Sequence, residues 1–197
     1  MSKLKSTIAV ALSILLSFAL VTPSMAARVY NADTNTWEEP AVVAQRGHGR
    51  SAIPREEVAY DGTYAPGSII VETAERRLYF VLGDGRALRY GIGVGRDGFT
   101  WSGTHRVSRK AEWPGWTPPA QMRKRVPDLP AYMPGGPDNP LGARAMYIGS
   151  TLYRLHGTSE PWSIGQAVSS GCIRLTNEDV IDLYDRVKVG ALVVVHH

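Results

Sequence analysis

The chain contains a single cysteine, Cys172, and a histidine, His156, stands sixteen residues before it. A thiolate attacks carbonyl carbons, but a free thiol is mostly protonated at neutral pH and therefore needs a base. His156 is the histidine nearest to Cys172 in the sequence, so it is the candidate base. Because one cysteine cannot form an intramolecular disulfide, Cys172 is either an inert buried thiol or a catalytic nucleophile.

The residues around Cys172 favour the catalytic interpretation. Ser169, Ser170 and Gly171 precede it, and such small residues let the backbone turn sharply and leave amides accessible to an oxyanion. In an extended segment Arg174 points to the same side as Cys172, where it can hold a carboxylate or lower the pKa of the thiol. No third histidine or cysteine stands at ligand spacing, so the sequence predicts neither a metal site nor a cofactor.

Short β-strands must position these groups. From Gly67 onward, apolar runs alternate with tight turns such as Gly83-Asp84-Gly85, which predicts an antiparallel meander. The predicted strands cover residues 68–73, 77–82, 86–94, 104–110, 144–148, 151–156 and 191–195. His156 ends one of these strands, so its side chain projects from a rigid frame.

One helix is predicted, beginning near Thr176 and ending at Gly190. Thr176 followed by Asp179 is typical of an N-terminal capping box. Apolar residues recur with helical spacing, at Val180, Leu183, Tyr184 and Val187.

Residues 113–140 hold eight of the thirteen prolines. Proline at this density excludes a regular helix or a central strand, so the segment is predicted to be a long loop. Long loops within compact domains are usually functional. We therefore expect an ordered loop whose aromatic residues line a substrate pocket with Trp162, namely Trp113, Trp116 and Tyr132.

The N-terminal 26 residues are typical of a secretory signal peptide. Lys3 and Lys5 precede an apolar run over residues 8–21, and Ala26 ends a small-residue cleavage signal. An uncleaved membrane anchor is the alternative, although the apolar run is short for a bilayer span. Residues 27–66 are polar and are expected to form an irregular lead-in. The formal net charge of +4 says little about partners, and the sequence holds no basic stripe of the kind that binds nucleic acid.

The run from His156-Gly157-Thr158 through Ser169-Ser170-Gly171-Cys172-Ile173-Arg174-Leu175 resembles the signature of the L,D-transpeptidase (YkuD-type) catalytic domain, in its ErfK/YbiS-like form. The similarity extends over residues 67–196. It implies a mainly β, sandwich-like fold with one or two short helices and a long proline-rich loop.

The resemblance also implies a role for each motif residue. Cys172 matches the nucleophile and His156 the general base, while the backbone of Ser170 and Gly171 frames the oxyanion hole. Arg174 matches an arginine that orients a substrate carboxylate. The residues expected to contact substrate beside it are Gly157, Ser169, Tyr132 and Trp162.

The activity implied by the resemblance is that of an exported transpeptidase of the periplasm or cell wall. Cys172 would attack a peptidoglycan stem tetrapeptide, release D-alanine and form a thioester. The acyl group would then pass to an amine of a second stem peptide, of a D-amino acid or of a wall-attached protein. A monomer is expected, with no cofactor, no nucleic acid and no stable membrane span after signal cleavage.

Three other functions remain open at this point. The first is an L,D-carboxypeptidase or other thiol hydrolase, although papain-like peptidases place the cysteine before the histidine. The second is a sortase-like transpeptidase, whose motif residues are spaced more widely. The third is a non-catalytic wall-binding module, which would predict loss of His156 or Cys172.

Overall fold

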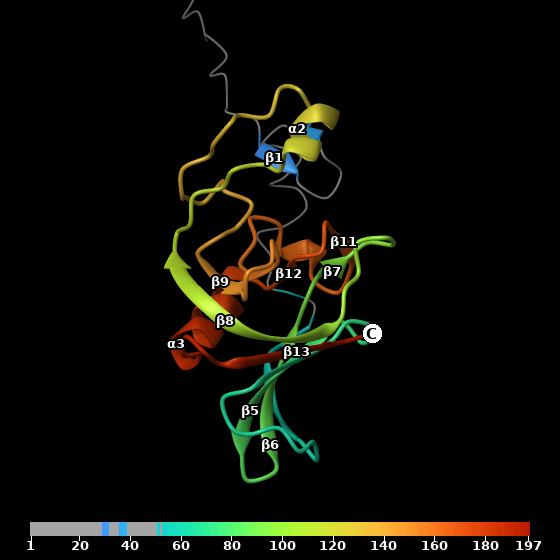
Figure 1. Ribbon diagram of the computed structural model, residues 1–197, viewed down its shortest axis with the longest axis vertical. Coiled ribbons are helices and arrows are strands. Elements are labelled where there is room, and N and C mark those ends of the chain that lie inside the picture. The colour runs from blue at the N-terminus through green and yellow to red at the C-terminus, as the bar shows by residue number, and fades with distance from the viewer. Residues whose placement is uncertain (1–28, 32–35, 39–50, 52) are drawn as a thin grey trace, which may run out of the picture.

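The computed structural model describes residues 29–31, 36–38, 51 and 53–197 (Figure 1). The predicted signal peptide, residues 1–26, lies outside the described residues. Within the ranges that are described, no helix has the length and apolar character needed to cross a membrane.

A nine-stranded sheet forms the body of the molecule, with the order β12-β10-β9-β8-β13-β4-β5-β6-β3. Figure 1 shows this sheet strongly curled, with β8 bending along its length. The chain is therefore mainly β, which confirms the predicted fold class. The strands are β3 (Glu56–Ala59), β4 (Ile69–Glu72), β5 (Arg77–Gly83), β6 (Arg86–Gly91), β8 (Gly103–Glu112), β9 (Arg144–Ile148), β10 (Arg154–His156), β12 (Ile173–Arg174) and β13 (Leu192–His196).

The predicted meander is confirmed, because β4 pairs antiparallel with β5, and β5 antiparallel with β6. The last strand, β13, lies between the meander and the rest of the sheet. It pairs parallel with β4 and antiparallel with β8. Two smaller sheets accompany the main one: β7 (Val94–Gly95) with β11 (Ala167–Ser169), and β1 (Val29–Asn31) with β2 (Thr36–Glu38).

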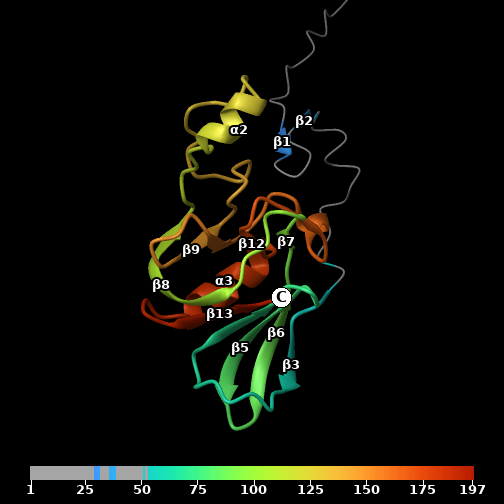
Figure 2. The ribbon, with the colours of Figure 1, turned by 45° about the vertical axis from the view of Figure 1, so that its right-hand side comes forward.

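The predicted helix is α3 (Asn177–Arg186), and a 3₁₀ turn, η1, covers Pro161–Ser163. The hydroxyl of Thr176 accepts the Asp179 amide at 3.0 Å, which confirms the predicted cap. The helix ends at Arg186, four residues before the predicted end at Gly190. Val180 and Leu183 are fully buried in the main core, together with Leu155 and Ile173 of the sheet. Figure 2 shows α3 in the middle of the molecule, with the meander at one end and α2 at the other.

The expectation that residues 27–66 are irregular is wrong at β3, which pairs antiparallel with β6 at the edge of the sheet. The strand reads Glu-Glu-Val-Ala and is mostly exposed, so it carries no apolar alternation to reveal it. The backbone ladder with β6 holds the strand, and across the two strands Glu57 pairs with Arg86 at 2.7 Å and Glu56 pairs with Arg89. Charged edge strands of this kind resist pairing with other chains.

The expectation that residues 113–140 exclude a helix is also wrong, because α2 (Ala120–Arg125) lies among the prolines. Pro119 occupies the position before the first helical residue, where the missing amide proton costs nothing, and the next proline is Pro127. A small separate core holds this segment in place. Its buried members are Trp116, Met122, Leu129 and Leu141.

Candidate active site

The pairing of β10 with β12 brings the candidate catalytic groups together. The two strands run parallel, with Leu155 opposite Ile173 and His156 opposite Arg174. Leu155 and Ile173 point into the core, where they are 0% and 2% exposed. Because side chains alternate across a strand, the neighbouring residues of both strands point to the opposite face. That face carries Arg154 and His156 from β10, and Cys172 and Arg174 from the β12 segment.

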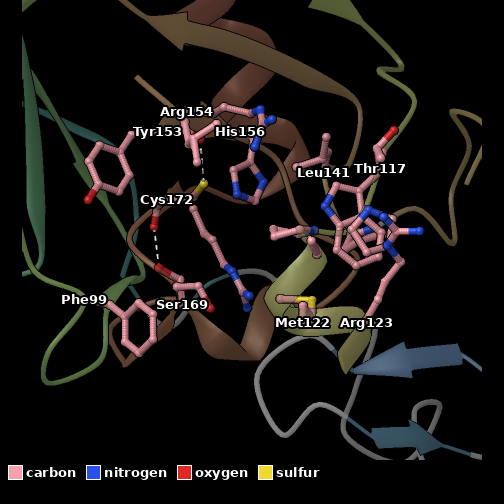
Figure 3. Close-up of a pocket in the computed structure, with 18 of the residues that line it drawn as sticks. Phe99, Thr117, Met122, Arg123, Leu141, Tyr153, Arg154, His156, Ser169 and Cys172 are labelled. Atoms are coloured by element: carbon pink, nitrogen blue, oxygen red, sulfur yellow. Dashed lines mark hydrogen bonds between the residues drawn. The ribbon is translucent and has the colours of Figure 1, made fainter. Parts of the chain in front are cut away.

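This face forms one wall of a cavity of about 660 Å³ (Figure 3). Phe99 and Tyr153 lie on one side of Cys172, and Met122 and Arg123 of α2 lie on the other. Among the residues that the structure describes, four arginines and no aspartate or glutamate line the cavity, so these walls favour an anionic ligand. The lining arginines are Arg123, Arg125, Arg154 and Arg174.

The imidazole of His156 is buried, being 4% exposed. Burial lowers its pKa to about 4, although hydrogen bonds to the carbonyls of Gly157 and Leu141 act in the opposite direction. The ring is therefore neutral at pH 7. Nδ1 lies 2.6 Å from the Gly157 carbonyl oxygen, which can only accept, so Nδ1 carries the proton. Nε2 is left with the lone pair of a base.

Burial raises the pKa of the Cys172 thiol. The charge of Arg154 and its hydrogen bonds to the sulfur oppose this rise. Sγ also lies 4.0 Å from the carbonyl oxygen of Leu152. Figure 3 shows the side chains of Cys172, His156 and Arg154 gathered at one place in the cavity wall. A neutral thiol thus stands beside a neutral base, with one cation close to both.

A tight turn presents the sulfur. The Ser169 hydroxyl donates to the carbonyl of Cys172 and accepts the amide of Gly171 at 3.1 Å. Gly171 adopts φ +102°, which favours glycine. A Cβ on Gly171 would lie 2.6 Å from Cε1 of Tyr153, and the indole of Trp101 donates to its carbonyl at 2.7 Å. The backbone conformation and the nearness of Tyr153 therefore both require glycine at position 171.

Arg174 lines the cavity, but its charge is already balanced within the protein. Its Nη1 lies 3.4 Å from Oε2 of Glu160, and both side chains are buried. Burial lowers the pKa of this guanidinium to about 10, so it stays charged at neutral pH. Thr158 in turn holds the backbone of Glu160, accepting its amide at 3.0 Å.

Not all the residues expected to contact substrate lie at the cavity. Ser169, Ser170 and Trp116 line it, whereas Tyr132, Trp113 and Trp162 are not among its lining residues. Tyr132 is 58% exposed and Trp113 44%. These three aromatic side chains are therefore not part of the cavity wall, whereas Trp116 is.

Gly157 also lies outside the cavity lining, behind His156. A Cβ on Gly157 would lie 2.3 Å from Oδ1 of Asn177. That oxygen accepts the Ala143 amide at 2.8 Å. Gly157 therefore allows α3 to pack closely against the end of β10, which fixes the direction of the His156 side chain.

Sequence reasoning missed Arg154. It stands two residues before His156 in the same strand, and alternation alone places the two side chains on one face. The ring of Tyr147, opposite Arg154 on β9, lies 5.3 Å from its guanidinium carbon. The predicted strand already places Arg154 and His156 on one face. The sequence does not show that this strand pairs with the segment next to Cys172.

Comparison with known proteins identifies the family of the chain. Residues 66–195 match the model of the YkuD family, the L,D-transpeptidase catalytic domain. The chain is 46% identical over 134 residues to the probable L,D-transpeptidase ErfK/SrfK of Escherichia coli, covering 64% of this chain and 42% of that protein. The chain thus spans under half the length of that curated relative.

Two crystal structures resemble the fold. One is named a probable carnitine operon oxidoreductase caia, from Brucella melitensis. It is 41% identical, with a TM-score of 0.52, over 76% of this chain and 96% of that one. The other is L,D-transpeptidase 3 of Mycobacterium tuberculosis with a faropenem-derived adduct. It is 20% identical, with a TM-score of 0.54, over 68% of this chain and 61% of that one.

The matched region includes the strands and the turn that carry His156 and Cys172. The chain belongs to the YkuD family of L,D-transpeptidase catalytic domains.

Proposed function

We propose that the protein is an exported L,D-transpeptidase that transfers acyl groups from peptidoglycan stem tetrapeptides, with Cys172 as nucleophile and His156 as general base. One observation carries the proposal: a neutral imidazole, fixed as its Nδ1–H tautomer, shares a cationic cavity with the only thiol. Family membership supplies the substrate class. The apolar N-terminal segment supports export to the periplasm or cell wall.

Acylation starts from the neutral pair. The thiol proton passes to Nε2 of His156 while Sγ attacks the carbonyl carbon of the third stem residue, a diamino acid. The family resemblance implies that the backbone of Ser170 and Gly171 frames the oxyanion hole. Because the amide of Gly171 already donates to the Ser169 hydroxyl, we assign the oxyanion to the amide of Cys172 instead. The carbon–nitrogen bond to the terminal D-alanine then breaks, and the imidazolium returns its proton to the departing nitrogen. A thioester on Cys172 remains.

Deacylation reverses these steps with a different amine. The acceptor nitrogen attacks the thioester carbon, and its proton passes to Nε2 of His156 as the carbon–sulfur bond breaks. Protonation of the sulfur restores the neutral pair. An acceptor amine from a second stem peptide yields a cross-link between two third residues, and a D-amino acid or a protein amine yields an exchange or attachment product.

The test is incubation of the purified protein with a disaccharide tetrapeptide, read by intact-protein mass spectrometry. We expect an adduct on Cys172 whose mass equals the donor minus D-alanine, and free D-alanine in equal amount. Cys172→Ala should form no adduct, and His156→Gln should form it at least about a hundredfold more slowly. Turnover by Cys172→Ala at the parent rate would refute the assignment of the nucleophile.

A further inference from the structure

The sequence assigned the substrate carboxylate to Arg174, but the structure gives two arginines near the thiol with different electrostatic surroundings. Arg174 has Glu160 at 3.4 Å. Within the part of the chain that the structure describes, Arg154 has no carboxylate within ion-pair distance. Of these two arginines, Arg154 is therefore the one whose positive charge a bound anion would balance.

The position of Arg154 follows from strand register. Leu155 pairs with Ile173 and His156 with Arg174, so the next step of the same parallel register sets Arg154 beside Cys172. The guanidinium acts electrostatically on both the thiol and the imidazole. The ring of Tyr147 supports it from β9, and Arg109 lies over that same ring at 3.6 Å.

The chemistry of the proposed donor supplies an anion at this place. The residue that leaves carries its α-carboxylate two bonds from the scissile nitrogen. When the scissile carbonyl carbon is at Sγ, that carboxylate lies close to the nucleophile. A guanidinium binds a carboxylate through two parallel hydrogen bonds, which adds direction to attraction.

We propose that Arg154 binds the terminal carboxylate of the donor peptide and thereby selects donors that end one residue after the scissile bond. This inference rests on the proposed function. An additional residue would move the carboxylate away from Arg154, and amidation would remove its charge. Arg154 thus recognises the end of the donor chain, while Arg174 and Glu160 support the wall of the cavity.

The first experiment compares two matched donors, a tetrapeptide ending in D-alanine and the same peptide ending in D-alaninamide. The protein should form the thioester about 10- to 100-fold faster with the free carboxylate, as expected for a charge-assisted hydrogen-bonded pair. Arg154→Gln should reduce this ratio to within about threefold, and Arg154→Lys should retain part of it. Because both donors react with the same thiol, a change in thiol reactivity alters both rates equally and leaves the ratio of the two rates unchanged.

Arg109→Gln is the matched control, because Arg109 shares the Tyr147 stack but is exposed on β8. It should keep the ratio of the parent protein. An unchanged ratio in Arg154→Gln would overturn the proposal. Thermal denaturation of each variant checks the fold, and Arg154→Lys serves in place of Arg154→Gln if the latter does not fold.

A second experiment needs no peptide and therefore separates this inference from the proposed function. Iodoacetate and iodoacetamide alkylate the same thiol and differ in one carboxylate. Relative to N-acetylcysteine, Cys172 should favour iodoacetate by about tenfold, and Arg154→Gln should lose this preference. A preference equal to that of N-acetylcysteine would refute the anion site, even if the protein turned over stem peptides. A preference without turnover would support the site and count against the proposed reaction.

Discussion

Glu160 and Arg174 form an ion pair with Oε2 and Nη1 3.4 Å apart, and their side chains are only 5% and 6% exposed. The pair joins the start of the 3₁₀ turn η1 to the end of β12, and its Arg174 lines the cavity. Removing one partner of a buried pair leaves an uncompensated charge, which costs far more than the pair itself contributes. Glu160 therefore stabilises the buried charge of Arg174.

Glu160→Gln should lower the free energy of unfolding by about 3 to 5 kcal/mol, because the buried Arg174 guanidinium loses its ion pair with the Glu160 carboxylate. Urea denaturation at pH 7 measures this change. Glu57→Gln is the matched control. It breaks the exposed pair with Arg86 and should change stability by less than about 1 kcal/mol. Equal effects of the two substitutions would contradict the structural role of Glu160.

Gly171→Ala should destabilise the protein and slow thioester formation by about a hundredfold or more. The substitution adds strain at φ +102° and places a Cβ against Tyr153, so the turn that presents Cys172 must shift. Gly98→Ala separates the two effects. Gly98 has φ +79° with nothing within 4 Å of an added Cβ, so it should cost only about 1 to 2 kcal/mol and keep activity. A fully active Gly171→Ala variant would show that the turn is more tolerant than its contacts indicate.

The buried imidazole makes stability depend on pH. The pKa of His156 is about 4 in the folded state and near 6.5 in an unfolded chain. The unfolded state therefore binds the extra proton first as pH falls. Stability should be fully present above pH 6.5 and should decline by roughly 2 to 3 kcal/mol between pH 7 and 4.5 from this group alone. His156→Gln should lose that share of the decline, as measured by urea denaturation at both pH values.

The His156→Gln comparison also separates this histidine from the acidic groups. Burial raises the pKa of Asp179, whereas the partners of Asp182, led by Arg186 and Tyr90, lower its pKa despite partial burial. Both carboxyls are present in the parent protein and in the variant. The difference between the two proteins therefore reports His156, and an identical decline in both would contradict its neutral, buried state.

Local features of the fold could be read from the sequence. The meander appears as apolar runs with glycine turns, and α3 appears through its Thr176 cap and its apolar spacing. The edge strand β3 could not be read, because its charged, exposed residues carry no alternation and its pairing with β6 is a tertiary contact. The helix α2 was excluded by counting prolines, whereas their exact positions before and after it decide the outcome.

The residues of the site also fall into those that the sequence pattern reveals and those that depend on tertiary contacts. The small residues before Cys172 and the upstream His156 indicated a nucleophile and base, and both line one cavity in the structure. Arg154 was visible as a residue type, but its place depends on a parallel pairing between strands that are separated by η1 and β11. Glu160 could not be assigned to Arg174, because ion pairs between loops and strands follow from tertiary packing.

The central place of β13 has a consequence for how the protein matures. β13 fills the gap between β8 and β4, so the half of the sheet that bears Cys172 joins the meander within the sheet only through this strand. β13 follows all the other strands of the sheet in the sequence, so a nascent chain cannot complete the sheet until β13 has been synthesised. The two halves of the sheet should therefore join later than the synthesis of the segment that carries His156 and Cys172.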